Sequence, residues 1–179
     1  ITLHPTMSGS KKLSEVGFKL SDEIFGKLVD TKHLPLPFYP SFNVEDDPSS
    51  GIDAGVSPPR YSEAYFALHN RFGALVETHS WKDYKTRVFA TRDALLAFFE
   101  LTARDGEKWM QKAREADDEM AAIGGKEYVL SYENNDVSNI IDFKGYAYKR
   151  EKSDISGASM TTYDPSKPEI WKIPLRDQV

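Results

Sequence analysis

Glu77 and His79 are the residues of this 179-residue chain whose type and position most suggest chemistry. They follow a continuous apolar run at residues 72–76, FGALV, in the segment FGALVETHSW. A short unbroken apolar run is typical of a strand buried on both faces of a mostly parallel sheet. Because ligands of open α/β sheets bind outside the carboxyl ends of the strands, Glu77 and His79 are expected at such a crevice.

A carboxylate at the end of a buried strand needs a compensating partner. Burying its charge is costly unless a cation, a metal or hydrogen-bond donors offset the lost hydration. Glu77 is therefore interpreted as a functional carboxylate, and the alternative is a structural ion pair with one of three nearby basic residues, Arg71, Lys82 or Arg87.

A second imidazole near the start of the chain could reach the same crevice. His4 follows the apolar residues Ile1-Thr2-Leu3, which resemble the tail of a buried strand, and the chain begins with Ile1 rather than methionine. These features predict a fragment or a processed product. The alternative for His4 is an ordinary surface histidine, because a motif this short often matches by chance.

The hydrophobic pattern predicts an α/β fold followed by a small β-rich appendage. Apolar residues at three- and four-residue steps predict a helix over 13–28 and, over about 91–122, either one long helix or two helices joined near Gly106. Six prolines predict a long loop over 34–60 that could wall a site. After residue 125, aromatic and β-branched runs alternate with turn residues, including 156–157 and 164–166. We predict a partial, mostly parallel sheet with flanking helices in residues 1–123 and the appendage in 124–179.

Composition excludes several classes of function. The 28 acidic residues outnumber the 23 basic ones, which argues against nucleic-acid binding. The sequence contains no run of about 20 apolar residues, the length that a membrane-spanning helix needs. The sequence therefore predicts a soluble protein whose compartment and oligomeric state it leaves open. Cysteine is absent, so any metal would need His, Asp or Glu ligands.

Four segments together resemble the bacterial branch of the carboxypeptidase A-type zinc peptidases. They are residues 76–84 (VETHSWKDY), 59–62 (PRYS), 142–146 (DFKGY) and 163–168 (YDPSKP). In that family an H-x-x-E motif supplies two zinc ligands, a later strand-end histidine the third, and a still later strand-end glutamate activates the zinc-bound water. The resemblance implies a carboxypeptidase-like fold, with His4 as the third ligand and Glu77 as the catalytic base.

The same resemblance assigns the substrate-binding residues. It implies that Arg60 holds the substrate carboxylate, that Tyr61 donates a hydrogen bond, and that His79 lies in the substrate pocket. Arg60 has a structural alternative, which is pairing with an acidic residue among Asp46, Asp47, Asp53 and Glu63. No H-x-x-E occurs in these residues, so the implied zinc would be bound in the complete protein and weakly or not at all by this chain alone.

A competing alignment places His79 as the third ligand. The catalytic glutamate would then lie near Glu151, within a charged segment at residues 149–152, so we favour His4 and Glu77. The expected function is metallocarboxypeptidase activity on a peptide, or amidohydrolase activity of the same fold on an acyl amino acid. A different class, a non-catalytic peptide- or glycan-binding module, is suggested by the aromatic residues Tyr128, Tyr132, Phe143, Tyr146, Tyr148, Tyr163 and Trp171. Aromatic residues at strand spacing are more often core, and their joint exposure would favour the module.

Overall fold

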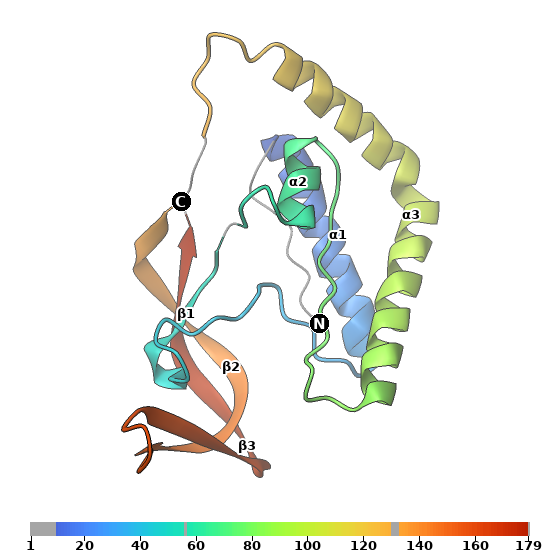
Figure 1. The fold of residues 1–179 in the computed structure, drawn as a ribbon. Coiled ribbons are helices and arrows are strands. Elements are labelled where there is room, and N and C mark those ends of the chain that lie inside the picture. Colours follow the sequence, from blue (N-terminus) through green and yellow to red (C-terminus); the bar gives the residue numbers. More distant parts are fainter. Residues whose placement is uncertain (1–9, 56, 130–132, 179) are drawn as a thin grey trace. The chain divides into compact units, whose positions relative to one another are not determined.

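The chain is mixed α/β and divides into two compact units. The structure is a computed structural model that describes residues 10–55, 57–129 and 133–178 (Figure 1). Unit 1 comprises residues 1–39 and 56–130, and unit 2 comprises residues 40–55 and 131–179. The predicted domain boundary between residues 123 and 124 stays a prediction. Residues 40–55 pack with the β-rich part of the chain in unit 2, although they precede most of unit 1 in the sequence. None of the described helices is long and apolar enough to cross a membrane.

Unit 1 is built on an antiparallel pair of helices, α1 (Lys11–Asp30) and α3 (Tyr84–Ala121), which run side by side in Figure 1. α1 buries the predicted apolar face through Leu13, Leu20, Ile24 and Leu28, which confirms the first predicted helix. α3 begins at Asp83, whose carboxylate accepts a 2.9 Å hydrogen bond from the backbone N–H of Thr86. It continues through Gly106, so the second predicted helix is confirmed as one element.

Two apolar clusters join these helices. The first contains Leu20, Ile24 and Leu28 of α1 with Ala94, Ala97 and Leu101 of α3. The second contains Leu13, Ala113 and Ala116. Because the small alanines of α3 face the larger side chains of α1, the helices can approach closely and bury a continuous seam.

Residues 72–76 lie in an extended segment on these clusters, and they do not form the predicted buried strand. No strand is assigned among residues 71–80, and only Glu77 takes part in an isolated β-bridge. Phe72 packs on the second cluster and Val76 on the first. Gly73 lies against α2 (Ser62–Leu68), since a Cβ added there would be 3.2 Å from the Cα of Glu63. Packing on helices thus buries the apolar run that the sequence assigned to a sheet.

A polar cluster fixes the start of this segment to α3. Arg71 makes a two-pronged ion pair with Asp117, with both N–O distances 3.0 Å, and the buried Asn70 donates to the same carboxylate at 3.0 Å. The Arg71 and Asn70 hydrogen bonds hold the pKa of Asp117 below its ordinary value. The cluster holds the backbone just before residue 72 in a fixed position on α3, because a two-pronged ion pair constrains both the orientation and the distance of its partners.

A hydrogen bond between His33 and Asp93 ties the segment after α1 to α3. His33 Nε2 lies 2.9 Å from Asp93 Oδ2, and both side chains are largely buried, at 15% and 12% exposure. Arg92 also contacts Asp93, at 2.6 Å. The hydrogen bond from His33, followed by that from Arg92, holds the pKa of Asp93 below its ordinary value.

An Asp93→Asn variant is expected to lower the free energy of unfolding at pH 7 by about 1.5–3 kcal/mol, the range for a hydrogen bond to a charged group. Because the folded-state pKa is depressed, this stabilisation is present above the unfolded-state pKa of about 4 and is lost as the pH falls through the folded-state value. Urea unfolding of both proteins from pH 7 to pH 3 measures it. A difference that persists unchanged at pH 3 would contradict the charge-based explanation.

Unit 2 is a three-stranded mixed sheet in the order β1-β3-β2. A long antiparallel hairpin joins β2 (Asn134–Lys152) and β3 (Ser159–Gln178), and the two-residue β1 (Ile52–Asp53) pairs with β3 in parallel. The sheet is therefore mainly antiparallel, and a mostly parallel sheet is not found among the described residues. Gly157, at φ 70°, lies in the hairpin turn, which confirms the turn predicted at residues 156–157.

The turn predicted at residues 164–166 is instead an irregularity inside β3. The register passes from Tyr146 opposite Pro168 to Ala147 opposite Asp164, so three residues of β3 bulge out of the ladder. The Asp164 carboxylate accepts a 3.0 Å hydrogen bond from the N–H of Ser166. The turn chemistry of Asp-Pro-Ser is therefore used without ending the strand.

Half-buried aromatic rings cluster around Trp171 in unit 2. Trp171 stacks on Phe143 at 5.8 Å between ring centroids and meets Tyr148 edge to face at 5.4 Å, and Phe42 and Tyr163 also contact it. The Trp171 indole donates a 3.1 Å hydrogen bond to the carbonyl of Tyr146. Burial among these rings raises the pKa of the Tyr163 hydroxyl.

Acidic residues of the 40–55 segment attach it to the hairpin. The carboxylate of Asp53 pairs with Arg176 at 2.8 and 3.1 Å, Asp47 pairs with Arg150, and Asp46 accepts a 2.6 Å hydrogen bond from the N–H of Thr161. A 3-10 turn, η1 (Pro48–Ser50), lies between these contacts. The proline-rich loop predicted over residues 34–60 is thus partly ordered, and it supplies β1.

Candidate functional site

Glu77 is an exposed carboxylate directly after an anchored residue. Val76 packs on the first apolar cluster, and the Glu77 side chain faces solvent. The predicted burial of this carboxylate is therefore wrong for the described structure. None of the described basic residues proposed as partners pairs with it, and Arg71 is already bound to Asp117.

His79 lies on the same exposed stretch. Its Nδ1 accepts a 3.2 Å hydrogen bond from the backbone N–H of Trp81, and its ring meets the Trp81 indole edge to face at 5.3 Å. An acceptor Nδ1 leaves Nε2 as the nitrogen that carries the proton in the neutral ring. Trp81 is 83% exposed, so an imidazole donor and an aromatic surface are presented together, two and four residues beyond Glu77.

Arg60 and Tyr61 lie at the amino end of α2. The Arg60 guanidinium donates to the Tyr61 hydroxyl at 3.0 Å and lies 5.0 Å from the centre of its ring. Within the described ranges Arg60 has no carboxylate partner, and three of the acidic residues considered for it, Asp46, Asp47 and Asp53, bind groups of unit 2 instead. The guanidinium is thus exposed and held near a phenol, an arrangement that can bind a carboxylate.

These four residues all belong to unit 1, yet no contact between the two pairs is found. Within the part of the chain that the structure describes, no hydrogen bond or ion pair joins Glu77 or His79 to Arg60 or Tyr61. The link between them is indirect: α2 follows Arg60 and Tyr61, and Gly73 of the extended segment packs on α2. The shared pocket that the resemblance implies therefore remains a prediction.

The metal assignment rests on a residue that the structure does not describe. His4 lies outside the described residues, so its proximity to Glu77 stays a prediction. Among residues 10–55, 57–129 and 133–178, no group of three His, Cys, Asp or Glu side chains is placed to hold a metal ion. In the competing alignment, Glu151 belongs to β2 of unit 2 and His79 to unit 1, which leaves that alignment untested.

Sequence reasoning did not select a groove between α1 and α3. Its lining includes Trp109 with Lys108 and Lys112, a pair of lysines spaced four residues apart beside an aromatic residue. That spacing places both lysines on one face of a helix, and this is the feature of the sequence that could have indicated the groove. A tryptophan within an apolar helical pattern predicts core packing and does not by itself indicate a groove.

A comparison of the chain with protein-family models, curated proteins and solved structures found no match.

Proposed function

We propose that this chain carries the catalytic glutamate of a zinc-dependent metallocarboxypeptidase and that its residues 1–123 are the C-terminal portion of the catalytic domain. The observation that carries the proposal is the presentation of Glu77 in the segment VETHSWKDY. The carboxylate is exposed, it is unpaired among the described residues, and it directly follows Val76, which is fixed in the helical core. A catalytic base must be accessible to water and carried by a well-positioned backbone; the exposure of Glu77 supports the first requirement and the packing of Val76 supports the second.

The extended segment itself supports a carboxypeptidase-like sheet in the complete domain. Residues 72–76 are extended and lie on helices, but they make no strand ladder within the described parts of the chain. Backbone N–H and C=O groups of an extended, half-buried segment are readily paired by a neighbouring strand. In the proposal, strands of the complete domain pair there, giving the mostly parallel sheet with flanking helices.

In this mechanism the residues of the chain have distinct roles. The Glu77 carboxylate accepts a proton from the attacking water and returns it to the nitrogen of the leaving amine. Arg60 binds the free carboxylate of the substrate with Tyr61 beside it, and His79 donates a hydrogen bond to the bound peptide. Zinc bound by the complete protein would polarise the scissile carbonyl and acidify the water.

The packing of the aromatic side chains supports the alternative function, a peptide- or glycan-binding module, less well than the position of Glu77 supports the peptidase. That alternative requires several aromatic side chains exposed together on one face. In unit 2, Phe143, Tyr148, Tyr163 and Trp171 instead pack on one another and are only partly accessible. Their packing favours a structural role, as expected for aromatic residues in a small β unit.

The proposal is tested by comparing the complete protein with the isolated 179-residue chain. After exhaustive dialysis, the complete protein is expected to retain zinc and to release C-terminal residues from a peptide acid, whereas the isolated chain retains little zinc and is inactive. The same peptide with an amidated C-terminus should be cleaved poorly, because it lacks the carboxylate that Arg60 binds. An acylated single amino acid distinguishes an amidohydrolase.

Three results would contradict parts of the assignment. Stoichiometric, tightly held zinc in the isolated chain would show that its ligands lie within these residues, with His79 or His33 joining His4. Equal cleavage of the peptide acid and the peptide amide by the complete protein would remove the proposed role of Arg60. Absence of any hydrolysis by the zinc-loaded complete protein would end the peptidase proposal.

A further inference from the structure

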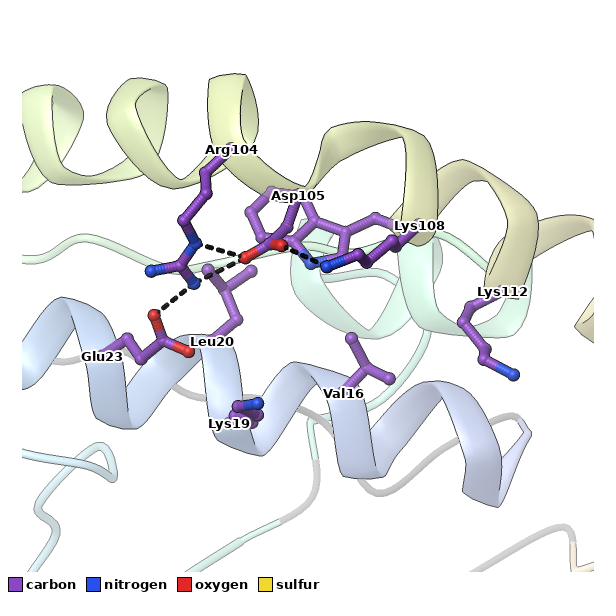
Figure 2. Close-up of a pocket in the computed structure, with 9 residues that line it drawn as sticks. Val16, Lys19, Leu20, Glu23, Arg104, Asp105, Lys108 and Lys112 are labelled. Atoms are coloured by element: carbon purple, nitrogen blue, oxygen red, sulfur yellow. Dashed lines mark hydrogen bonds and ion pairs between the residues drawn. The ribbon is translucent and has the colours of Figure 1, made fainter.

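The groove between α1 and α3 is a defined cavity away from Glu77. It has a volume of about 220 Å³ and is lined from α1 by Val16, Lys19, Leu20 and Glu23 and from α3 by Arg104, Asp105, Lys108, Trp109 and Lys112. Figure 2 shows Leu20 and Glu23 of α1 and Arg104, Asp105 and Lys108 of α3 in the space between the two facing helices. The cavity lies wholly within unit 1.

One wall of the groove is apolar and held in place. Trp109 contacts Phe72 at 5.9 Å and Phe98 at 6.2 Å between ring centroids, and it packs on the first apolar cluster. Val16 and Leu20 lie opposite on α1. A flat apolar group could lie between these residues without requiring Trp109 to move, because its neighbours fix the indole ring.

The charged side chains of the groove differ in how far ion pairs neutralise them. Arg104 lies 2.5 Å from both Glu23 and Asp105, so its charge is balanced within the groove, as the dashed lines in Figure 2 show. Lys108 shares Asp105 at 3.1 Å and is 80% exposed, and Lys112 pairs with Glu115. Among the described residues Lys19 has no carboxylate partner.

This distribution gives the groove a charge opposite to that of the chain. Four basic and two acidic side chains line it, and Glu115, which pairs with Lys112, lies beside it, so the groove carries a small positive excess, whereas the whole chain has a formal charge of −5. Lys19 comes from α1 and Lys108 and Lys112 from α3, so positive charge borders the apolar wall from both helices. A local excess of cations beside an apolar wall attracts an anion that carries an apolar body.

From this geometry we infer that the groove binds a small carboxylate with a flat apolar body. The apolar body contacts Trp109, Val16 and Leu20, and the carboxylate lies between Lys19 and Lys108. The cavity is below the range of about 300–1,000 Å³ usual for drug-sized ligands, which limits the ligand to about one ring and a short acidic chain. This binding is independent of the peptidase proposal, because none of its residues is assigned to hydrolysis.

The test uses 3-phenylpropionate, its neutral amide 3-phenylpropionamide, and inorganic phosphate as probes of the ¹⁵N-labelled chain. NMR titration is expected to shift the Trp109 indole N–H and backbone amides of residues 16–23 and 104–112 with 3-phenylpropionate. The amide and phosphate are each expected to bind about tenfold more weakly, because each lacks one of the two recognised features. Added salt should weaken the binding of 3-phenylpropionate.

Two double-lysine variants distinguish binding of 3-phenylpropionate in the groove from nonspecific attraction of the anion to a positively charged surface. Lys19→Gln combined with Lys108→Gln is expected to weaken 3-phenylpropionate binding about tenfold. The matched control is Lys11→Gln combined with Lys85→Gln, which removes the same charge from the same helices outside the groove. Circular dichroism confirms that both variants fold. Equal weakening in the two variants, shifts confined to other surfaces, equal binding of the amide, or no binding would each overturn the inference.

Discussion

Replacing Glu77 by glutamine in the complete protein is expected to reduce peptide hydrolysis by at least about a hundredfold, the lower limit for losing a general base. Glutamine has nearly the same shape, but its amide cannot accept the proton from the attacking water. The exposed position of Glu77 predicts little effect on folding, because surface substitutions usually change stability by less than about 0.5 kcal/mol. The measurement is kcat for release of the C-terminal residue, with zinc content determined on the same samples.

Glu127→Gln is the matched control for this variant. Glu127 is another exposed glutamate of unit 1, so the substitution makes the same chemical change away from the segment VETHSWKDY. Its kcat and zinc content should equal those of the unmodified protein. Preserved turnover in Glu77→Gln would remove Glu77 from the mechanism, and loss of zinc in that variant would identify the carboxylate as a metal ligand instead of a base.

Gly145→Ala is expected to lower the free energy of unfolding of unit 2 by about 1–3 kcal/mol, the usual cost of overpacking a core. A Cβ at this position would lie less than 3.0 Å from three carbons of the Trp171 indole. The indole has little freedom to move, because it is stacked on Phe143 and donates a hydrogen bond to the Tyr146 carbonyl. Urea unfolding followed by circular dichroism in the β-sheet region measures the loss.

Two further variants test whether the stability loss of Gly145→Ala comes from contact with the Trp171 indole. Gly124→Ala adds the same methyl group where no atom lies within 4 Å, so its stability should remain within about 0.5 kcal/mol. In a Trp171→Leu background the large ring is absent, and adding Gly145→Ala should then cost less than it does in the unmodified chain. An undiminished cost in that background would show that the effect comes from the strand backbone rather than from the indole.

The helices of unit 1 could be predicted from the sequence because their signals are local. Leu13, Leu20, Ile24 and Leu28 recur at helical spacing, and that repeat alone defines the buried face of α1. The hairpin turn at Gly157 was predictable for a similar reason, since glycine readily adopts its positive φ. In both cases the determining residues lie within a few positions of one another.

Residues 72–76 show what a local pattern cannot decide. The run FGALV satisfies a buried strand and a segment packed on helices equally well, because both place Phe72 and Val76 against apolar neighbours. Which neighbours are present depends on α1 and α3, far away in the sequence. The exposure of Glu77 follows from the same long-range packing and could not be read from the run itself.

The bulge in β3 shows a related limit. Asp164, Pro165 and Ser166 have the chemistry of a turn, and the Asp164 carboxylate does bond the N–H of Ser166 as in a turn. The strand nevertheless resumes, because Pro168 and the residues after it again find partners on β2. Whether such a segment ends a strand or only interrupts it is decided by the partner strand, which the local sequence does not contain.

The interleaving of the two units along the chain has a consequence for biosynthesis. Residues 40–55 leave the ribosome before α3, but they pack with the β2–β3 hairpin, which is synthesised after residue 131. The helical pair of unit 1 can therefore assemble during translation while this early segment, with Asp46, Asp47 and Asp53, still lacks Thr161, Arg150 and Arg176. A nascent chain stalled near residue 130 should thus be readily cleaved by protease within residues 40–55, and protection should follow once β3 has emerged.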